Sequence, residues 1–357
     1  TFASDRRDSM ANLTIGTFNL NNLFDRFNFQ AEIGAVPARD RDVRTTYQWV
    51  VTGRGTAPGA PPPQLDPTES TSPVYRIQRG TDGTLIKPKS ERELASLAGR
   101  ISAMDLDVLC VQEVENLDAL RAFNRSHLDS PYRYEVLVEG NDPRFIDVAV
   151  LSRLPVANVT SNRFETHPDE PDAPVFGRDA LGVDILTPTR SRRLITIFVN
   201  HLKSNFVRFD DPDPDATQAA NRRRRLRQAQ VLRRVVEDRT RPRSKFVVLG
   251  DMNDAPDAES LEPFAGWLTD GMQDAVESAL PPPATNPVDV PGSPRWTHRL
   301  SVSNGPDRFE LLDQIWLSPS LAPRLDHAEI QRRPAWSATS VGVGSDHDPA
   351  WVRLTGL

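Results

Sequence analysis

The side chains of this sequence that could do chemistry lie mainly in a few short polar clusters. The most informative is Ser345-Asp346-His347-Asp348, in which an imidazole lies between two carboxylates. Such a group can transfer protons through the imidazole and bind a cation through the carboxylates. The same run also occurs by chance in solvated loops, so its meaning depends on the other clusters.

Four more polar clusters each follow a short apolar run that is typical of a buried strand. Ligand sites of α/β proteins commonly lie where such strands end, so the clusters indicate one shared site. They are Phe18-Asn19-Leu20-Asn21, Gln112-Glu113, Asn200-His201-Leu202-Lys203-Ser204 and Gly250-Asp251-Met252-Asn253-Asp254. A sixth strand-like segment, 311–317, carries Asp313 among apolar residues, where a lone carboxylate needs a partner.

Taken in chain order, the motifs N-x-N, Q-E, N-H-x-K-S, G-D-x-N, D and S-D-H resemble the endonuclease/exonuclease/phosphatase superfamily. The resemblance extends over residues 13–354, and the wording F-N-L-N-N-L-F-D, E-V-E-N and N-H-L-K-S is most similar to bacterial nuclease-like members. It implies an α/β fold, the deoxyribonuclease I-like four-layer sandwich. In that fold two mostly antiparallel β-sheets pack face to face and are flanked by helices.

The resemblance also implies a role for each cluster. Glu113 matches the principal metal ligand, whereas Asn21 stands where relatives often have Asp and therefore lacks one negative charge. Whether His347 acts as a base or as a charged stabiliser stays open. The expected residues are His201, Asp251, Asn253, Asp313 and His347 for catalysis, Glu113, Asn21 and Asp346 for the metal, and Asn19, Lys203, Arg144 and Arg178 for the substrate phosphate.

The donor set predicts the metal. Carboxylate and amide oxygens suit Mg²⁺, with Mn²⁺ as a substitute, and the sequence has neither a Cys/His cluster nor the zinc motif H-E-x-x-H. The single cysteine, Cys110, lies in an apolar run, which excludes an internal disulfide framework and indicates core packing.

Composition indicates an ordinary globular protein of 357 residues, with 38% hydrophobic and 26% charged side chains. The net charge is −6, although a nucleic-acid binder is often basic. A carboxylate-rich metal site and a local basic patch are compatible with that value. Four consecutive arginines, Arg222 to Arg225, fall within a predicted helix and would mostly form a solvated face, with nucleic-acid contact as the alternative.

The polar clusters must be positioned by alternating helices and strands. Ser90 and Glu93 have capping-box spacing at the start of a predicted helix over 90–104, and two further helices are predicted over 116–128 and 217–238. We expect one catalytic domain over 11–357, with 1–10 as an N-terminal extension. A long inserted loop at about 29–89 is expected to be either disordered or plain surface elaboration, or else a substrate-shaping segment.

The leading hypothesis is a divalent-metal-dependent nuclease that cleaves DNA or RNA by water attack. The alternatives are a phosphoesterase for lipid head groups, inositol phosphates or other small esters, and a catalytically inactive nucleic-acid-binding module. The sequence contains no run of 18 apolar residues, so a membrane span is not predicted. The first residues lack the apolar centre of a signal peptide. The compartment is therefore unknown, with the cytoplasm slightly favoured, and a monomer is expected.

Overall fold

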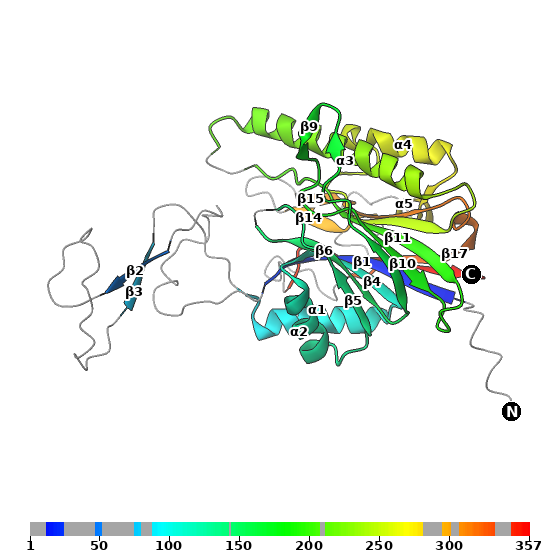
Figure 1. Cartoon of the computed structure of the whole chain (residues 1–357), viewed down its shortest axis with the longest axis horizontal. Helices are drawn as coiled ribbons and strands as arrows, with labels where there is room; N and C mark the ends of the chain where they lie inside the picture. Colours follow the sequence, from blue (N-terminus) through cyan, green and yellow to red (C-terminus); the bar gives the residue numbers. More distant parts are fainter. Residues whose placement is uncertain are drawn as a thin grey trace. The chain divides into compact units, whose positions relative to one another are not determined.

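The structure is a computed structural model that describes residues 12–24, 47–51, 75–79, 88–142, 144–207, 211–280, 295–300, 307–332 and 344–357. The chain divides into two compact units, one made of 1–23 with 89–357 and the other of 24–88. The larger unit contains two six-stranded sheets with helices on both sides (Figure 1). The expected N-terminal extension, 1–10, lies outside the described residues.

The first sheet carries a single parallel pair near its centre. β1 runs parallel to β4, and every other neighbouring pair of this sheet is antiparallel. Its strands, in spatial order, are β17 (Leu325–Ile330), β18 (Ala350–Thr355), β1 (Asn12–Leu23), β4 (Val108–Val114), β6 (Asp147–Ser152) and β5 (Tyr134–Leu137).

The second sheet has the same plan. β11 runs parallel to β12, and the remaining neighbours are antiparallel. Its strands, in spatial order, are β13 (Gln273–Asp274), β16 (Asp313–Leu317), β12 (Phe246–Asp251), β11 (Arg193–His201), β10 (Leu181–Leu186) and β7 (Val156–Thr160). The expectation of two mostly antiparallel sheets is therefore confirmed.

Alternating side chains along the strands build three apolar cores. In β12, Val247 and Leu249 face the core between the sheets, whereas Val248 faces the helices. In β4, Cys110 lies in the inter-sheet core and Leu109 in the core beneath the first sheet's helices. Successive strand residues point to opposite faces, so strands that are apolar on both faces must lie between two covered layers.

Helices cover the outer face of each sheet, which completes four layers (Figure 1). α1 (Glu91–Met104) and α2 (Leu117–His127) pack on the first sheet, and α3 (Pro214–Arg239) and α4 (Glu262–Thr269) pack on the second. The predicted capping box at Ser90 is present, with the Ser90 side chain accepting from Glu93 N. α3 begins three residues before the predicted 217, because Asp213 caps it and Pro214 occupies its first turn.

Short elements complete the larger unit. They are the hairpin strands β8 (Thr166–His167) and β9 (Glu170–Pro174), the hairpin strands β14 (His298–Leu300) and β15 (Arg308–Glu310), α5 (Ala275–Ala279), and the 3₁₀ turns η2 (Glu259–Leu261) and η3 (Ala322–Arg324). Across the described ranges, no helix is both long and apolar enough to cross a membrane.

The smaller unit contains one antiparallel strand pair, β2 (Tyr47–Val51) with β3 (Tyr75–Arg79). This pair falls inside the segment predicted as a long inserted loop at about 29–89. Most of the rest of that segment lies outside the described residues.

Candidate active site

Three strands of the second sheet place catalytic candidates side by side. In the parallel pair of β11 and β12, His201 is the register partner of Asp251. In the antiparallel pair of β12 and β16, Asp251 is the partner of Asp313. All three residues are buried, so strand register brings together side chains that are far apart in the sequence.

The first sheet contributes Asn19 and Glu113, which meet Asp251 across the two sheets. The Nδ2 atom of Asn19 donates to Asp251 Oδ2 at 2.9 Å and lies 3.4 Å from Glu113 Oε1. His201 Nε2 is 3.5 Å from Asp251 Oδ2 and 3.9 Å from Glu113 Oε1. Two carboxylates, one amide and one imidazole thus converge at the edges of the paired sheets.

The backbone around these residues is unusual. Glu113 has a φ of 62° and Asn253 a φ of 56°, both in the left-handed region that costs non-glycine residues about 1–3 kcal/mol. At Gly250, with a φ of 136°, an added Cβ would lie only 1.9 Å from the backbone oxygen of Asn200. The motif therefore requires glycine before Asp251, because β11 approaches β12 too closely for any side chain.

Asn253 holds the carboxylate of Asp251 and the end of β11 together. Its backbone N–H donates to Asp251 Oδ1 at 2.9 Å, and its Nδ2 donates to the carbonyl of Leu202 at 3.0 Å. The left-handed conformation of Asn253 is thus stabilised by two hydrogen bonds at the site itself.

The C-terminal S-D-H run brings a second imidazole to Asp251. His347 Nδ1 lies 2.6 Å from Asp313 Oδ2, and its Nε2 lies 3.9 Å from Asp251 Oδ2. Ser345 positions the run, because its Oγ donates to the Asn19 carbonyl at 2.7 Å and accepts from the His347 backbone N–H at 3.0 Å. His201 and His347 therefore both lie near the same carboxylate.

The two imidazoles have opposite electrostatic environments. Burial, together with the positive charges of Arg178 and Arg144, lowers the pKa of His201 well below its usual value. Burial also acts to lower the pKa of His347, but the charge and hydrogen bond of Asp313 outweigh it and raise that pKa well above its usual value. At neutral pH the environment thus favours a neutral His201 and a charged His347.

Burial raises the pKa of Asp251 to about 6, against the opposing charge of His347. A carboxylate with a pKa near 6 binds a proton far more readily at neutral pH than an exposed Asp does. Paired titratable groups whose pKa values are pushed apart are typical of sites that perform acid–base chemistry.

A group of cations lies beside the carboxylates. The carboxylate of Asp142 contacts two arginines, Arg178 Nε at 2.9 Å and Arg144 Nε at 3.2 Å, and Arg178 Nη1 donates to the carbonyl of Leu202 at 3.3 Å. Burial and the charges of Arg178 and Arg144 lower the pKa of Lys203 to about 8. Positive charges that are crowded in this way are stabilised by a bound anion.

The donor set on the Glu113 side fits a hard divalent cation. The Glu113 and Asp251 carboxylates share the Asn19 amide despite their like charges, and oxygen donors are the ligands that Mg²⁺ prefers. The backbone N–H of Asn21 donates to Asn19 Oδ1 at 2.9 Å, whereas its side-chain oxygen accepts from Asn22 Nδ2 at 3.0 Å. Asp346 lies next to His298, with Oδ2 3.8 Å from His298 Nε2. The metal roles of Glu113, Asn21 and Asp346 stay predictions.

Three residues at this site were not identified from the sequence. Lys89 Nζ donates to the Asn21 carbonyl at 2.6 Å, and burial lowers its pKa against the charges of Glu93, Glu113 and Asp346. His298 and Glu310 lie on the short hairpin β14–β15. Strands of three residues carry too little periodicity to be recognised in the sequence.

The arginine run of α3 divides into two parts. Arg222, Arg223 and Arg224 are exposed, as expected of a solvated face, whereas Arg225 is fully buried. Arg225 donates to Lys203 O, Asn205 Oδ1, Ser260 Oγ and Asp254 Oδ2 at 2.5–2.9 Å. Three of the four arginines thus agree with the expectation of a mostly solvated face, and Arg225 is the exception, because it links the loop after β11 to the loop after β12.

The face-to-face sheets and the polar residues at their edges define a phosphoesterase fold of the deoxyribonuclease I type. Residues 77–347 match the endonuclease/exonuclease/phosphatase family, and the chain belongs to this family. Its members are hydrolases that act on phosphoesters and generally use divalent metals. A comparison with curated protein sequences found no match.

Solved structures with this fold include different kinds of protein. An endonuclease/exonuclease/phosphatase family protein from Bacteroides thetaiotaomicron is 14% identical, with a TM-score of 0.54 over 97% of this chain and 98% of that one. An AP endonuclease from Archaeoglobus fulgidus is 18% identical, with a TM-score of 0.51 over 75% and 96%. A mannosyl-6-phosphatase from B. thetaiotaomicron is 14% identical, with a TM-score of 0.54 over 96% and 100%. At these identities the likeness concerns the fold alone.

Proposed function

We propose that the protein is a divalent-metal-dependent phosphodiesterase that cleaves DNA or RNA with water as the nucleophile. The observation that carries the proposal is the arrangement around Asp251. Converging carboxylates suited to a cation lie beside the cations Arg144, Arg178 and Lys203, which are suited to a phosphate. Hydrolysis of a phosphodiester needs both features, because negative charge on the phosphoryl oxygens must be neutralised.

Each residue of the site then has a defined task. Asp251 orients the attacking water and accepts its proton, and Asn19 and Asn253 fix the two carboxylate oxygens of Asp251. His347, charged because of Asp313, donates to a phosphoryl oxygen. A cation held by Glu113, with Asn21 and Asp346, would neutralise charge on the phosphate.

His201 completes the set near the leaving oxygen. Its environment favours the neutral imidazole in the free protein, so a proton-donating role requires the bound phosphate to raise its pKa. The negative charge of a phosphate acts in that direction.

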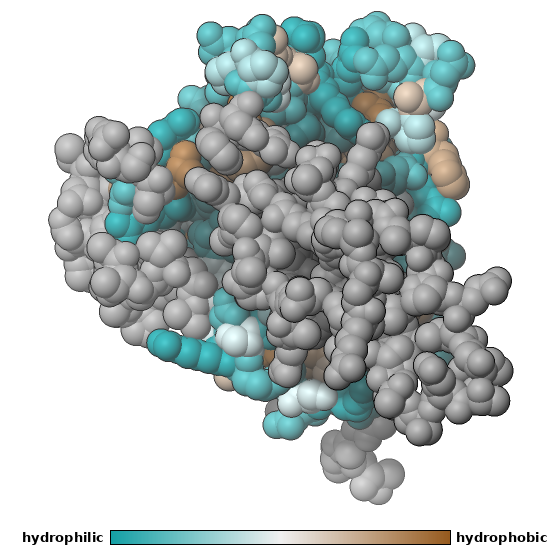
Figure 2. All heavy atoms as spheres, turned by 90° about the vertical axis from the view of Figure 1, so that its left-hand side faces the viewer, coloured by the Kyte–Doolittle hydropathy of each residue, from teal (hydrophilic) through white to brown (hydrophobic). Residues whose placement is uncertain are grey.

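The cationic group favours a polymeric substrate over a small ester. Its positive charge extends from Arg144 and Arg178 to the exposed Arg224 on α3, whose charge also acts on Lys203. A surface with several separated cations can contact more than one phosphate of a chain. The described residues visible in Figure 2 are mostly hydrophilic, with some hydrophobic ones among them.

A phosphoesterase for small phosphate esters is the second candidate, because a mannosyl-6-phosphatase shares the fold. The two are separated by incubating the protein with plasmid DNA, single-stranded DNA, RNA, bis-p-nitrophenyl phosphate and p-nitrophenyl phosphate, each with Mg²⁺, Mn²⁺ or EDTA. The p-nitrophenyl phosphate tests for monoester hydrolysis. Asp251→Asn and His347→Ala test the site, and His327→Ala, on β17, is the matched control. We expect metal-dependent cleavage of nucleic acid that both site variants lose. Cleavage of the small esters alone would remove the nuclease assignment.

A further inference from the structure

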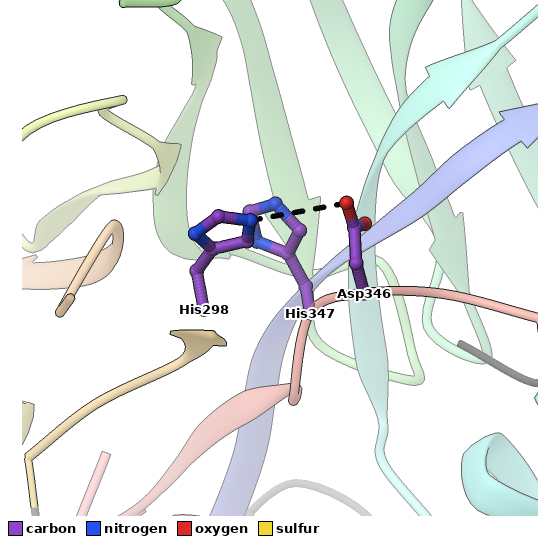
Figure 3. Close-up of side chains that lie close together, drawn as sticks. All are labelled: His298, Asp346 and His347. Carbon is purple, nitrogen blue, oxygen red and sulfur yellow. Dashed lines mark ion pairs between the residues drawn. The ribbon is translucent and has the colours of Figure 1, made fainter. Parts of the chain in front are cut away.

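Two imidazoles are held opposite each other next to the hydrolytic site. His298 on β14 and His347 form an isolated antiparallel bridge, and the Asp348 backbone N–H donates to the Thr297 carbonyl at 2.7 Å. The ring centroids of His298 and His347 lie 4.9 Å apart (Figure 3). The backbone therefore fixes the two rings close together before any ligand binds.

The carboxylate of Asp346 lies beside these two imidazoles. His298, Asp346 and His347 together are called the imidazole cluster. One ligand atom from each residue lies within 4.8 Å of the others. Asp346 Oδ2 faces His298 Nε2 at 3.8 Å, which is too long for a hydrogen bond (Figure 3). Two ligands at about 2.1 Å from a tetrahedral ion lie roughly 3.4 Å apart, so only a small inward movement would close this pair on an ion.

Each imidazole of the cluster has a further carboxylate next to its Nδ1 atom. Asp313 Oδ2 lies 2.6 Å from His347 Nδ1, and Glu310 Oε2 lies 3.6 Å from His298 Nδ1. Arg308 Nη2 in turn lies 2.7 Å from Glu310 Oε1. Metal-ligating histidines commonly have this second carboxylate, which orients the ring and leaves Nε2 for the ion.

We propose that the imidazole cluster binds a transition-metal ion of the Zn²⁺ or Co²⁺ class, which displaces the proton of His347 Nε2 to solvent, and that this ion inhibits hydrolysis because it occupies that nitrogen. Two imidazoles with one carboxylate favour such ions over Mg²⁺, whereas the oxygen donors around Glu113 favour Mg²⁺. Asp346 is common to the imidazole cluster and to the proposed Mg²⁺ site. The inhibitory effect rests on the proposed function, since it assumes that His347 acts on the phosphate. The binding site itself does not.

The binding experiment titrates the full chain, freed of metal, with Co²⁺ in millimolar Mg²⁺ and follows the visible absorption of bound Co²⁺. Wild type should bind one ion that shows d–d bands, and His298→Gln should bind at least tenfold more weakly. Glu310→Gln should bind about tenfold more weakly, because it removes only the carboxylate behind the ring. The matched control is His327→Gln, a histidine that also has a carboxylate partner, Glu329, at 3.4 Å.

Equal Co²⁺ affinity in His298→Gln and wild type, with both proteins folded by melting temperature, would overturn the site. A binding loss in His327→Gln as large as in His298→Gln would do the same.

The inhibition experiment adds Zn²⁺ to Mg²⁺-supported hydrolysis of bis-p-nitrophenyl phosphate, with each variant normalised to its own rate without Zn²⁺. The half-inhibitory concentration should rise at least tenfold in His298→Gln. Zinc that binds wild type without slowing it would refute the inhibitory effect. Absence of all hydrolysis would instead reject the proposed function, while the Co²⁺ result would still decide the site.

Discussion

Replacing Asp313 with asparagine removes the negative charge behind His347 and keeps a side chain of the same shape. The carboxylate oxygen lies 2.6 Å from His347 Nδ1, and both side chains are buried. At an effective dielectric constant of about 20, two unit charges at this separation attract by roughly 6 kcal/mol, which is an upper bound on the loss. Orientation and charging of a catalytic imidazole are typically worth ~10²–10⁴-fold in rate, or about 3–5 kcal/mol.

The pH dependence identifies the cause of that loss. In wild type, the rate should rise through about pH 6 as Asp251 loses its proton, and should stay high while His347 keeps its own. In Asp313→Asn the pKa of His347 falls, so the rate should decline at a lower pH and the ratio of wild-type to variant rates should grow as pH rises.

The assay is the kcat of bis-p-nitrophenyl phosphate hydrolysis from pH 5 to 9 in Mg²⁺. Asp274→Asn is the matched control, because Asp274 is also a buried carboxylate of the second sheet but pairs with Trp316 rather than with His347. A variant as fast as wild type, or one slowed equally at every pH, would refute the reasoning.

Three further predictions concern stability and substrate binding. Arg225→Met should lower the free energy of unfolding by about 2–4 kcal/mol in urea, because it leaves Asp254 without its buried partner; an unchanged midpoint would contradict this. Burial raises the pKa of Asp274 to about 7 from 3.8, so its stabilisation is complete below about pH 4 and is lost as pH rises through 7. The free energy of unfolding of Asp274→Asn should therefore depend less on pH than that of wild type. If the curves of the two proteins against pH run parallel, the raised pKa of Asp274 is contradicted. Arg144→Gln should raise KM for DNA and weaken its salt dependence, unlike the control Arg353→Gln; equal effects would exclude a local phosphate contact.

The strands that carry the site could be predicted because apolar runs ended abruptly in polar residues. The runs before Glu113 and Asp251 are buried on both faces, and such runs are a strong signal even in a single sequence. The capping box at Ser90 likewise fixed the start of α1. These signals are local in the sequence, so they can be recognised without knowledge of the fold.

The features that the sequence did not reveal depend on register and packing. Nothing in the sequence states that Asp251 pairs with both His201 and Asp313, which follows from the order of strands in the sheet. Arg225 looked like its neighbours because four arginines in a row carry no helical periodicity, and only the packing of α3 buries one of them. His298 comes near His347 through a bridge between segments about fifty positions apart, which no local pattern encodes.

The central claim, that oxygen-bearing side chains around Glu113 hold a cation for phosphodiester hydrolysis, is tested most directly by one titration. The rate of bis-p-nitrophenyl phosphate hydrolysis is measured against Mg²⁺ concentration for wild type and Glu113→Gln after treatment with EDTA. We predict no activity without metal, saturation in wild type, and at least a tenfold higher Mg²⁺ requirement in the variant. Full activity in EDTA, or identical titrations for the two proteins, would contradict it.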